Sequence, residues 1–478
     1  GPFPHTRPTH PITRTRPHNA LLAPMRRPAQ ILLALTLCAC TRSGKPSTPP
    51  GDTADHVIVV SIDGLMPEVY LRPDELGLKV PTLRALKAAG AHSPGMRGVF
   101  PTVTYPTHTT MVTGVEPGTH GIVANVPLDP MQTNAEGWYW YAQDIRSPTL
   151  WDVAEAAGRR TALVFWPVTV GARVSWLVPE YWRARTVDDD KLIAALSTPG
   201  LLPAVQARFP DFAREYTPTR RSDTGLTDIA VHLIEHERPA LVLLHVFDVD
   251  SRQHSFGPRS PEAFAVIETA DAQVARLIAA AKQAGTWART TLMVVSDHGF
   301  LPIARRVRPG VLLQGLGLVE LDGERLRDWR VGMSLSGGQA YLYLKNQGDD
   351  AARRAIVDGF TALVGQKDSG ISRVYGQEEI VARGGDPEAA LALEAATGFS
   401  FANGYTGPVI DDAPAQYRGT HGYDPERPEM AAALIVVGPG VQAGREIAGA
   451  RMIDVAPTIA GLLGLSMPAA QGKALALR

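Results

Sequence analysis

Cysteine is almost absent from this chain of 478 residues, and the two that it has, Cys38 and Cys40, lie together near the amino end. A mature chain that begins at Cys40 would contain no second cysteine. Such a chain forms no intramolecular disulfide, and its folded part has no thiol for catalysis or metal binding. Its stability and its chemistry must therefore come from other residue types.

The chain also lacks an excess of charge of either sign and a high aromatic content. Its 47 Lys and Arg residues balance 48 Asp and Glu residues to a formal net charge of −1, and aromatic residues make up 7%. Such a composition gives no electrostatic footprint for nucleic acid and no obvious stacking platform, so we expect no specific nucleic-acid binding. An apolar fraction of 45% is ordinary for a globular protein with a buried core.

The apolar run near the amino end, ILLALTL at 31–37, is too short to span a bilayer. Basic residues precede it and small residues follow it, which predicts a signal peptide over 25–40. Its ending, LCAC, resembles the lipobox of bacterial lipoproteins, in which Cys40 would carry a lipid anchor. We therefore expect an exported protein that is periplasmic or anchored to the bacterial envelope.

Composition separates further segments. Residues 1–24 are basic and rich in Pro and His, which is typical of an upstream extension or a remnant of cloning. Residues 41–55 are small, polar and rich in Pro, which predicts a flexible linker. We expect a single catalytic domain over 56–474, with insertions at about 130–225 and 301–415.

Apolar, β-branched runs alternate with helical patterns through the rest of the chain. The runs are apolar on both faces, which is typical of strands in a parallel sheet covered by helices on both sides. Helical spacing over 81–90 and 261–285 agrees with this, so the fold class is α/β with a mostly parallel central sheet. The strand candidates span 56–63, 160–166, 240–248, 290–297 and 431–438, with another in the second insertion at 339–345.

Acidic and histidine residues stand at the ends of these strands or just after them. Ligands in open α/β sheets collect at the carboxyl ends of strands, so these side chains are placed to share one site. One such Asp alone would be a helix cap or a turn residue. Several carboxylates in a dry crevice repel one another unless cations neutralise them, so the set indicates bound metal. Its members are Asp63, Asp248, Asp250, Asp297, His298 and His421.

The donor types narrow the choice of metal. Asp250 and His254 are four residues apart, which places them on one side of a helical turn. Three histidines and three carboxylates form a mixed nitrogen and oxygen set, which fits Zn²⁺ better than Mg²⁺ or Ca²⁺ and leaves Mn²⁺ and Fe open. Six side chains also suffice for two ions with three protein ligands each.

The segment 98–126 is crowded with hydroxyl groups. A threonine hydroxyl is a weak nucleophile at neutral pH, but coordination to a metal removes that difficulty. Any one of these residues taken alone could equally be a helix cap or a strand residue. The candidates are Thr102, Thr104, Thr107, Thr109 and Thr110.

Four ordered motifs resemble those of a known family. The stretch FPTVTYPTHTTMVTGVEPGTHGIVAN, which follows VSIDG, is similar to the nucleophile segment of the type I phosphodiesterase/nucleotide pyrophosphatase family of the alkaline phosphatase superfamily. DVDSRQHSFGP, VVSDHGF and GTHGYDP resemble the later metal motifs of that family, in the same order. The resemblance covers about 56–463 and implies an alkaline-phosphatase-like fold. The ordered set is specific, whereas any one motif alone is weak.

The resemblance implies a role for each matching residue. Thr104 would be the nucleophile, and Asn125 would donate to a non-bridging phosphoryl oxygen. Tyr105 takes the place of a family aromatic on which a nucleobase stacks. Two divalent ions, expected to be Zn²⁺, would be bound, one by Asp63, Thr104, Asp297 and His298 and the other by Asp250, His254 and His421.

The implied activity is that of a metal-dependent phosphodiesterase/nucleotide pyrophosphatase that works through a covalent phosphothreonine. The substrate would be a small phosphate ester, such as a nucleotide. The alternative is a phosphomonoesterase with the same two-metal core, although no Lys or Arg can be tied to the site to grip a dianionic phosphate. A third interpretation is an envelope lipoprotein that binds without turnover, but all the expected ligands and the nucleophile are present.

Three other histidines are expected to be structural. His108 and His120 flank the threonine segment and are predicted to be hydrogen-bonded without binding metal. His245 lies inside an apolar strand, so we expect it to be buried.

Overall fold

The computed structural model describes residues 54–134, 137–183, 186, 188–217 and 220–478. The predicted signal segment 25–40, with Cys38 and Cys40, and the predicted linker up to residue 53 lie outside the described residues. None of the helices in the described part combines the length and the apolar character needed to cross a membrane.

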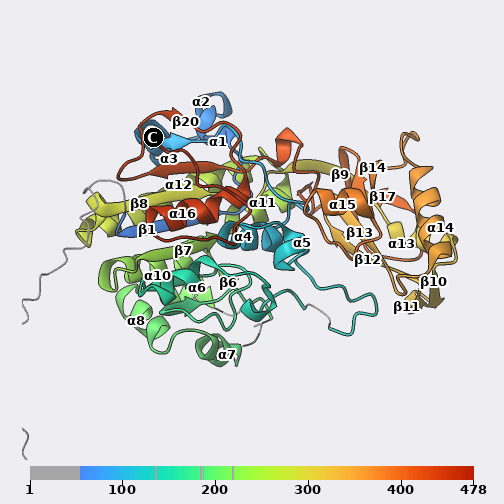
Figure 1. Ribbon diagram of the computed structural model, residues 1–478, viewed down its shortest axis with the longest axis horizontal. Coiled ribbons are helices and arrows are strands. Elements are labelled where there is room, and N and C mark those ends of the chain that lie inside the picture. Colours follow the sequence, from blue (N-terminus) through green and yellow to red (C-terminus); the bar gives the residue numbers. More distant parts are fainter. Residues whose placement is uncertain (1–53, 135–136, 184–185, 187, 218–219) are drawn as a thin grey trace, which may run out of the picture. The chain divides into compact units, whose positions relative to one another are not determined.

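A sheet of eight strands forms the centre of the described chain (Figure 1). In spatial order its strands are β20 (Arg445–Glu446), β2 (Ala91–His92), β19 (Leu434–Val437), β8 (Thr290–Val295), β1 (His56–Ile62), β7 (Leu241–Val246), β3 (Thr161–Val164) and β4 (Trp176–Val178). Val57 of β1 pairs in parallel with Leu241 of β7 on one side and with Thr291 of β8 on the other. β19 runs antiparallel to both of its neighbours, β8 and β2, whereas all the other neighbouring strands pair in parallel. The sheet is therefore mostly parallel, as predicted.

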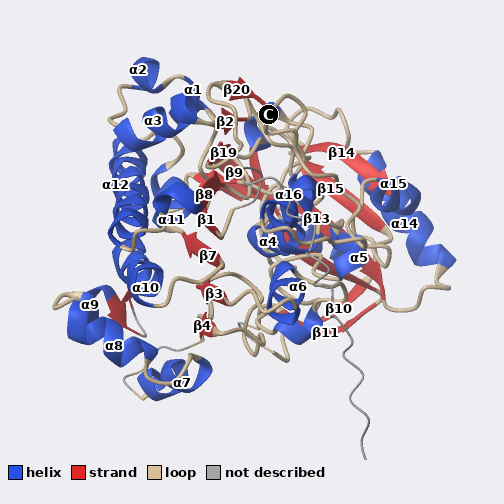
Figure 2. Cartoon of the chain, turned by 60° about the vertical axis from the view of Figure 1, so that its left-hand side comes forward, coloured by secondary structure: helices blue, strands red, loops and turns tan. Residues whose placement is uncertain are grey.

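Helices cover both faces of this sheet, because successive residues of a strand point to opposite sides. Ile58 and Val60 of β1 pack in a core with α3 (Pro81–Ala89), α10 (Asp223–His236) and α12 (Pro261–Gln283). Val57 and Val59 pack in a second core with α4 (Thr104–Thr113), α6 (Leu150–Ala156) and α16 (Val455–Leu462). Figure 2 shows the two helix layers on either side of the strands.

Local sequence explains where the predicted helices begin. Pro81 and Pro261 occupy the first positions of α3 and α12, where the missing N–H costs nothing. The Ser260 side chain accepts a hydrogen bond from the Ala263 N–H at 3.1 Å and so caps α12. The shorter helices of this part are α1 (Glu68–Leu71), α2 (Pro73–Leu76), α5 (Pro117–His120), α7 (Asp189–Leu196), α8 (Leu201–Arg208), α9 (Phe212–Glu215) and α11 (Asp248–Phe256).

The stretch 301–415 forms further sheets beside the central one, where the sequence predicted a single strand. The predicted strand is β13, and it lies within the antiparallel order β12-β13-β15-β14, while β9 pairs with β16, β17 and β18. The strands of this stretch are β9 (Leu301–Val307), β10 (Val319–Asp322), β11 (Arg325–Trp329), β12 (Val331–Ser336), β13 (Gln339–Leu344), β14 (Ile371–Gly376), β15 (Leu391–Ala395), β16 (Gly398–Phe401) and β17 (Ile410–Asp412). β18 (Gly419–Thr420) lies just after it. The helices are α13 (Pro309–Gly315), α14 (Asp350–Thr361) and α15 (Gln377–Ala382).

Most of these additional strands escaped prediction because they are irregular or partly exposed. β11 and β14 have side chains in solvent, and the pairing of β14 with β15 shifts register between Ile371 and Arg373. A half-exposed antiparallel strand with polar residues lacks the continuous apolar run that marks a strand of a parallel sheet. Within the range 130–225, β3 and β4 belong to the central sheet, while β5 (Tyr216–Thr217) and β6 (Arg220–Arg221) form a separate pair of very short strands.

Candidate active site

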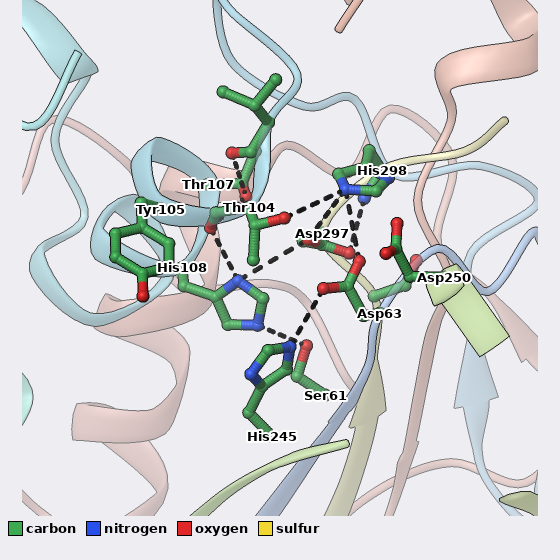
Figure 3. Close-up of polar contacts among 12 residues, drawn as sticks. Ser61, Asp63, Thr104, Tyr105, Thr107, His108, His245, Asp250, Asp297 and His298 are labelled. Carbon is green, nitrogen blue, oxygen red and sulfur yellow. Dashed lines mark hydrogen bonds and ion pairs between the residues drawn. The ribbon is translucent and has the colours of Figure 1, made fainter. Parts of the chain in front are cut away.

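A first cluster of potential metal ligands, here the Asp63 cluster, consists of Asp63, Asp297 and His298 (Figure 3). Asp63 directly follows β1, and Asp297 and His298 follow the neighbouring strand β8. The Nε2 atom of His298 lies 3.3 Å from Asp63 Oδ1 and 3.1 Å from Asp297 Oδ2. All three residues are buried. Adjacent parallel strands that end at the same edge therefore bring these side chains together.

A second cluster, the Asp250 cluster, consists of Asp250, His254 and His421. Asp250 and His254 lie on α11, and their spacing of four residues places His254 Nε2 3.3 Å from Asp250 Oδ1. His421 follows β18 and places its Nε2 3.6 Å from the same oxygen. The structure thus brings together the six predicted metal-binding side chains in two groups of three. Within each group, one ligand atom per residue lies within 4.8 Å of the others.

The loop that carries His421 is held by the turn between β12 and β13. The Gly338 N–H donates a hydrogen bond to the carbonyl of His421 at 2.8 Å. The next residue, Gly422, has a φ of +92°, and a β-carbon there would lie 1.8 Å from the carbonyl oxygen of Ser336. Only glycine fits at this close approach, which explains the glycine that follows His421.

The three histidines of the two clusters share one hydrogen-bonding pattern. The Nδ1 atoms of His254, His298 and His421 lie 2.8, 3.2 and 3.0 Å from the backbone carbonyls of Gly419, Gly299 and Thr102. Because a carbonyl only accepts, each Nδ1 carries the proton, and each Nε2 is directed at the carboxylates of its cluster. This is the arrangement that metal-binding histidines adopt.

The hydrogen bonding of the carboxylates shows whether a cation fits between them. Three buried carboxylate oxygens in these clusters, Asp63 Oδ1, Asp250 Oδ1 and Asp297 Oδ2, have no hydrogen-bond partner. Burial, and then the charges of Asp297 and Asp250, raise the pKa of Asp63 well above its ordinary value. Unpartnered oxygens that face histidine Nε2 atoms in a buried pocket are the donor set that a divalent cation requires, so the residues fit such an ion.

The two clusters are immediate neighbours. The rings of His298 and His421, one from each cluster, stack with their centroids 3.5 Å apart and an angle of 8° between their planes. The two groups of potential ligands therefore lie side by side.

Among the five candidate threonines, Thr104 is the one whose hydroxyl faces the Asp63 cluster. It begins helix α4, and its Oγ1 lies 3.5 Å from Nε2 of His298 (Figure 3). The amino end of a helix carries partial positive charge, which favours an anion beside Thr104. The other candidate hydroxyls bond elsewhere: Thr102 to the Tyr423 carbonyl, Thr107 to the Val103 and Thr104 carbonyls, Thr109 to the Tyr105 carbonyl and Thr110 to His120.

Asn125 is anchored to the start of the same helix. Its Oδ1 accepts a hydrogen bond from the Tyr105 N–H at 2.8 Å. Since an N–H group can only face the oxygen of the amide, the Nδ2 donors of Asn125 point the other way.

The ring of Tyr105 lies in an aromatic cluster and is completely buried. Its centroid is 5.2 Å from that of Trp138 and 6.3 Å from that of Trp140, and its hydroxyl donates to Glu180 Oε1 at 3.1 Å. Because no face of the Tyr105 ring is exposed, this packing does not favour nucleobase stacking on it. The stacking role of Tyr105 stays a prediction. Trp138, by contrast, is half-buried.

The three histidines expected to be structural, His108, His120 and His245, are buried and hydrogen-bonded. His108 lies 2.8 Å from both the Thr104 carbonyl and Ser61 Oγ, and burial lowers its pKa to about 3. His120 contacts Thr110 Oγ1 at 3.0 Å. A neutral His108 therefore ties the first residue of α4 to strand β1.

Asp223 and Asp248 stabilise the amino end of α11. Asp223 Oδ1 accepts hydrogen bonds from the N–H groups of Phe247 and Asp248, at 2.8 and 3.1 Å, and so caps the helix that carries Asp250 and His254. Asp248 Oδ2 accepts from the Asp223 N–H at 3.2 Å. Asp248, which the sequence grouped with the candidate metal ligands, thus lies outside both clusters. Its hydrogen bond to Asp223 helps to fix the position of α11.

Comparison with known proteins agrees with this geometry. The family model for type I phosphodiesterase / nucleotide pyrophosphatase matches residues 57–424. Ectonucleotide pyrophosphatase/phosphodiesterase family member 3 of Mus musculus is 28% identical over 273 residues, which are 55% of this chain and 26% of that protein. A venom phosphodiesterase of Macrovipera lebetinus is 26% identical over 278 residues, which are 55% of this chain and 28% of that protein. The chain thus spans about a quarter of the length of these relatives.

Solved structures show the same fold. Human ectonucleotide pyrophosphatase / phosphodiesterase 5 superposes with a TM-score of 0.60 at 22% identity, over 86% of this chain and 96% of that one. An inactive form of the murine protein, solved in complex with AMP, matches with the same TM-score, identity and coverage. With the family model matched across both clusters and the nucleophile segment, this chain belongs to the type I phosphodiesterase/nucleotide pyrophosphatase family.

Proposed function

We propose that this chain hydrolyses phosphate diesters of the nucleotide type by transferring a phosphoryl group to Thr104 and then to water. The observation that carries the proposal is the position of Thr104 Oγ1, at a helix amino end and 3.5 Å from Nε2 of His298 in the Asp63 cluster. The Asp250 cluster is adjacent, because the ring of its His421 stacks on the ring of His298. A nucleophile and two ligand groups around one substrate position are the parts that a two-step displacement at phosphorus needs.

The residues also support the proposed cofactor, which is a pair of Zn²⁺ ions. Asp63, Asp297 and His298, with Thr104, would hold one ion, and Asp250, His254 and His421 the other. When bound, the ions would activate the hydroxyl and the attacking water and neutralise charge on the phosphoryl and departing oxygens.

The chain's own residues account for the course of the reaction. Thr104 Oγ1 attacks phosphorus in line, the bond from phosphorus to the first alcohol breaks, and the proton of Thr104 leaves with that alcohol. Water then attacks the phosphothreonine, which returns the proton to Thr104 and releases a phosphate monoester. Two in-line displacements retain the configuration at phosphorus. The Nδ2 donors of Asn125 stabilise the charge that grows on a non-bridging oxygen.

Substitution of Asn125 tests that last role. We expect Asn125→Ala to lower kcat/KM for a diester by about 10²- to 10³-fold, the usual cost of losing one donor to a developing oxyanion. Asn125→Asp should cost as much or more, although its carboxylate still accepts from the Tyr105 N–H, because it offers no donor and repels the phosphoryl group. Steady-state kinetics measure both variants, and an Asn125→Asp variant with full activity would contradict the role.

The choice of substrate is tested by comparing bis-p-nitrophenyl phosphate with p-nitrophenyl phosphate on the purified, metal-loaded protein. We expect faster cleavage of the diester. Faster cleavage of the monoester would favour a phosphomonoesterase with the same core, and inactivity on both would favour a binding protein. Thr104→Ala and a chelated sample serve as controls for contaminating activity.

A further inference from the structure

A chain of buried hydrogen bonds lies behind Asp63, on the side away from His298. The Nε2 atom of His245 lies 3.1 Å from Asp63 Oδ2, and its Nδ1 atom lies 3.1 Å from Glu180 Oε2 (Figure 3 shows His245 beside Asp63). His245 and Glu180 are 1% and 2% exposed. The reaction outlined above uses neither residue. Burying a carboxylate costs folding free energy, which suggests that Glu180 has a function.

Glu180 joins this chain to the nucleophile segment. Its Oε1 accepts from the hydroxyl of Tyr105, the residue after Thr104, at 3.1 Å, and from the Trp182 indole N–H at 2.6 Å. One carboxylate from the loop after β4 thus contacts both the residue beside the nucleophile and, through His245, a predicted metal ligand.

The backbone around His245 adds a further contact. The carbonyl of Phe165 lies 3.1 Å from His245 Nδ1, and Phe165 has a φ of +56°. A bulky residue in the left-handed region is strained and persists only where the surroundings fix it. The orientation of the His245 ring is therefore set by two acceptors on its Nδ1 side, and its Nε2 side is directed at Asp63.

We propose that Glu180 and His245 are positioning residues that fix Asp63 in the orientation required by the cation of the Asp63 cluster. The inference rests on the proposed two-metal function and deepens it. His245 Nε2 forms a hydrogen bond with Asp63 Oδ2. Asp63 Oδ1 has no hydrogen-bond partner, so this oxygen alone is left to bind the ion. Asp297 needs no such help, because its Oδ1 accepts from the N–H groups of Gly64 and His298.

Cobalt titration of the purified, metal-free protein tests the proposal, since Co²⁺ absorption reports the ligands of each site. Outer hydrogen-bond partners of metal ligands typically contribute 10- to 100-fold in affinity. We expect His245→Leu and Glu180→Gln to weaken one of two bound ions by such a factor and to change its visible spectrum. The other ion should bind as in the wild type.

Conservative and matched variants separate positioning from general stability. His245→Gln keeps an N–H donor near the position of Nε2 and should recover most of the affinity that His245→Leu loses. His120→Leu removes another buried imidazole, and Glu394→Gln changes another buried carboxylate that accepts from a tyrosine, that of Tyr375. Neither control should alter Co²⁺ affinity or spectrum, whatever it does to the melting temperature of the metal-free protein.

The outcomes also separate this inference from the function on which it rests. A wild-type protein that binds two ions, together with His245→Leu and Glu180→Gln variants of unchanged affinity and spectrum, would overturn the positioning role alone. The same follows if His245→Gln is as impaired as His245→Leu, or if both affinities fall together with the melting temperature. A wild-type protein that binds no ion overturns the proposed function and this inference with it.

Discussion

Replacement of Thr104 by alanine is expected to abolish diester hydrolysis, with kcat lower by at least about 10⁴-fold. The Oγ1 atom beside His298 is the atom that forms the covalent bond to phosphorus in the proposed reaction. Without it, only direct attack by water remains, aided by whatever the site still contributes through binding and electrostatics. Steady-state kinetics, together with acid quenching to detect a phosphorylated chain, measure the loss and its cause.

The neighbouring residues provide the controls for this experiment. Thr104→Ser keeps a hydroxyl at the same position and should retain measurable turnover and a trapped phosphoenzyme. Thr109→Ala removes a buried hydroxyl that bonds the Tyr105 carbonyl one turn along α4, and should change kcat by no more than a few-fold. The threonine mechanism would be disproved if Thr104→Ala kept full turnover while its metal content matched that of the wild type.

Removal of metal is expected to have the second large effect. A chelated sample should show no diester hydrolysis, and Zn²⁺ should restore it more fully than Mg²⁺ or Ca²⁺, because the ligands combine histidine nitrogens with carboxylate oxygens. Stability should fall as well, since the clusters bury carboxylate oxygens that have no partner. A ligand at 1,000 times its dissociation constant contributes about 4 kcal/mol to folding. Elemental analysis, activity and thermal melting of the same samples measure all three quantities.

Single substitutions assign the ions to the two clusters. Asp297→Ala should reduce the metal content of the purified chain by one ion through the Asp63 cluster, and His254→Ala by one ion through the Asp250 cluster. The two losses should be independent in the double variant. Full turnover from a chain with well under one bound ion would rule out the proposed metal chemistry.

The elements that sequence predicts well here are those whose signal is local. The strands β1, β7 and β8 are continuous apolar runs, because helices bury both of their faces. The proposed metal ligands Asp63 and Asp297 are also visible in the sequence, since each directly follows one of these apolar runs. Asp250 and His254 add a helical spacing that is visible in the sequence.

The residues that sequence does not predict are those whose partners are distant along the chain. His245 has the pattern of a core strand residue, and only the pairing of β1 with β7 places it beside Asp63. Glu180 lies in a loop without a motif, and Asp223 caps α11 from the start of another helix. Such contacts depend on tertiary structure, so neither periodicity nor spacing can indicate them.

The location of β1 between β7 and β8 also affects how the chain can fold during its synthesis. β1 leaves the ribosome before both of its neighbouring strands, which lie well over a hundred residues later in the chain. At about 5–20 residues per second, an apolar strand with two unpaired edges would wait on the order of ten seconds for its first neighbour. Nascent chains of this protein should therefore depend on chaperones that shield such edges until β7 and β8 emerge.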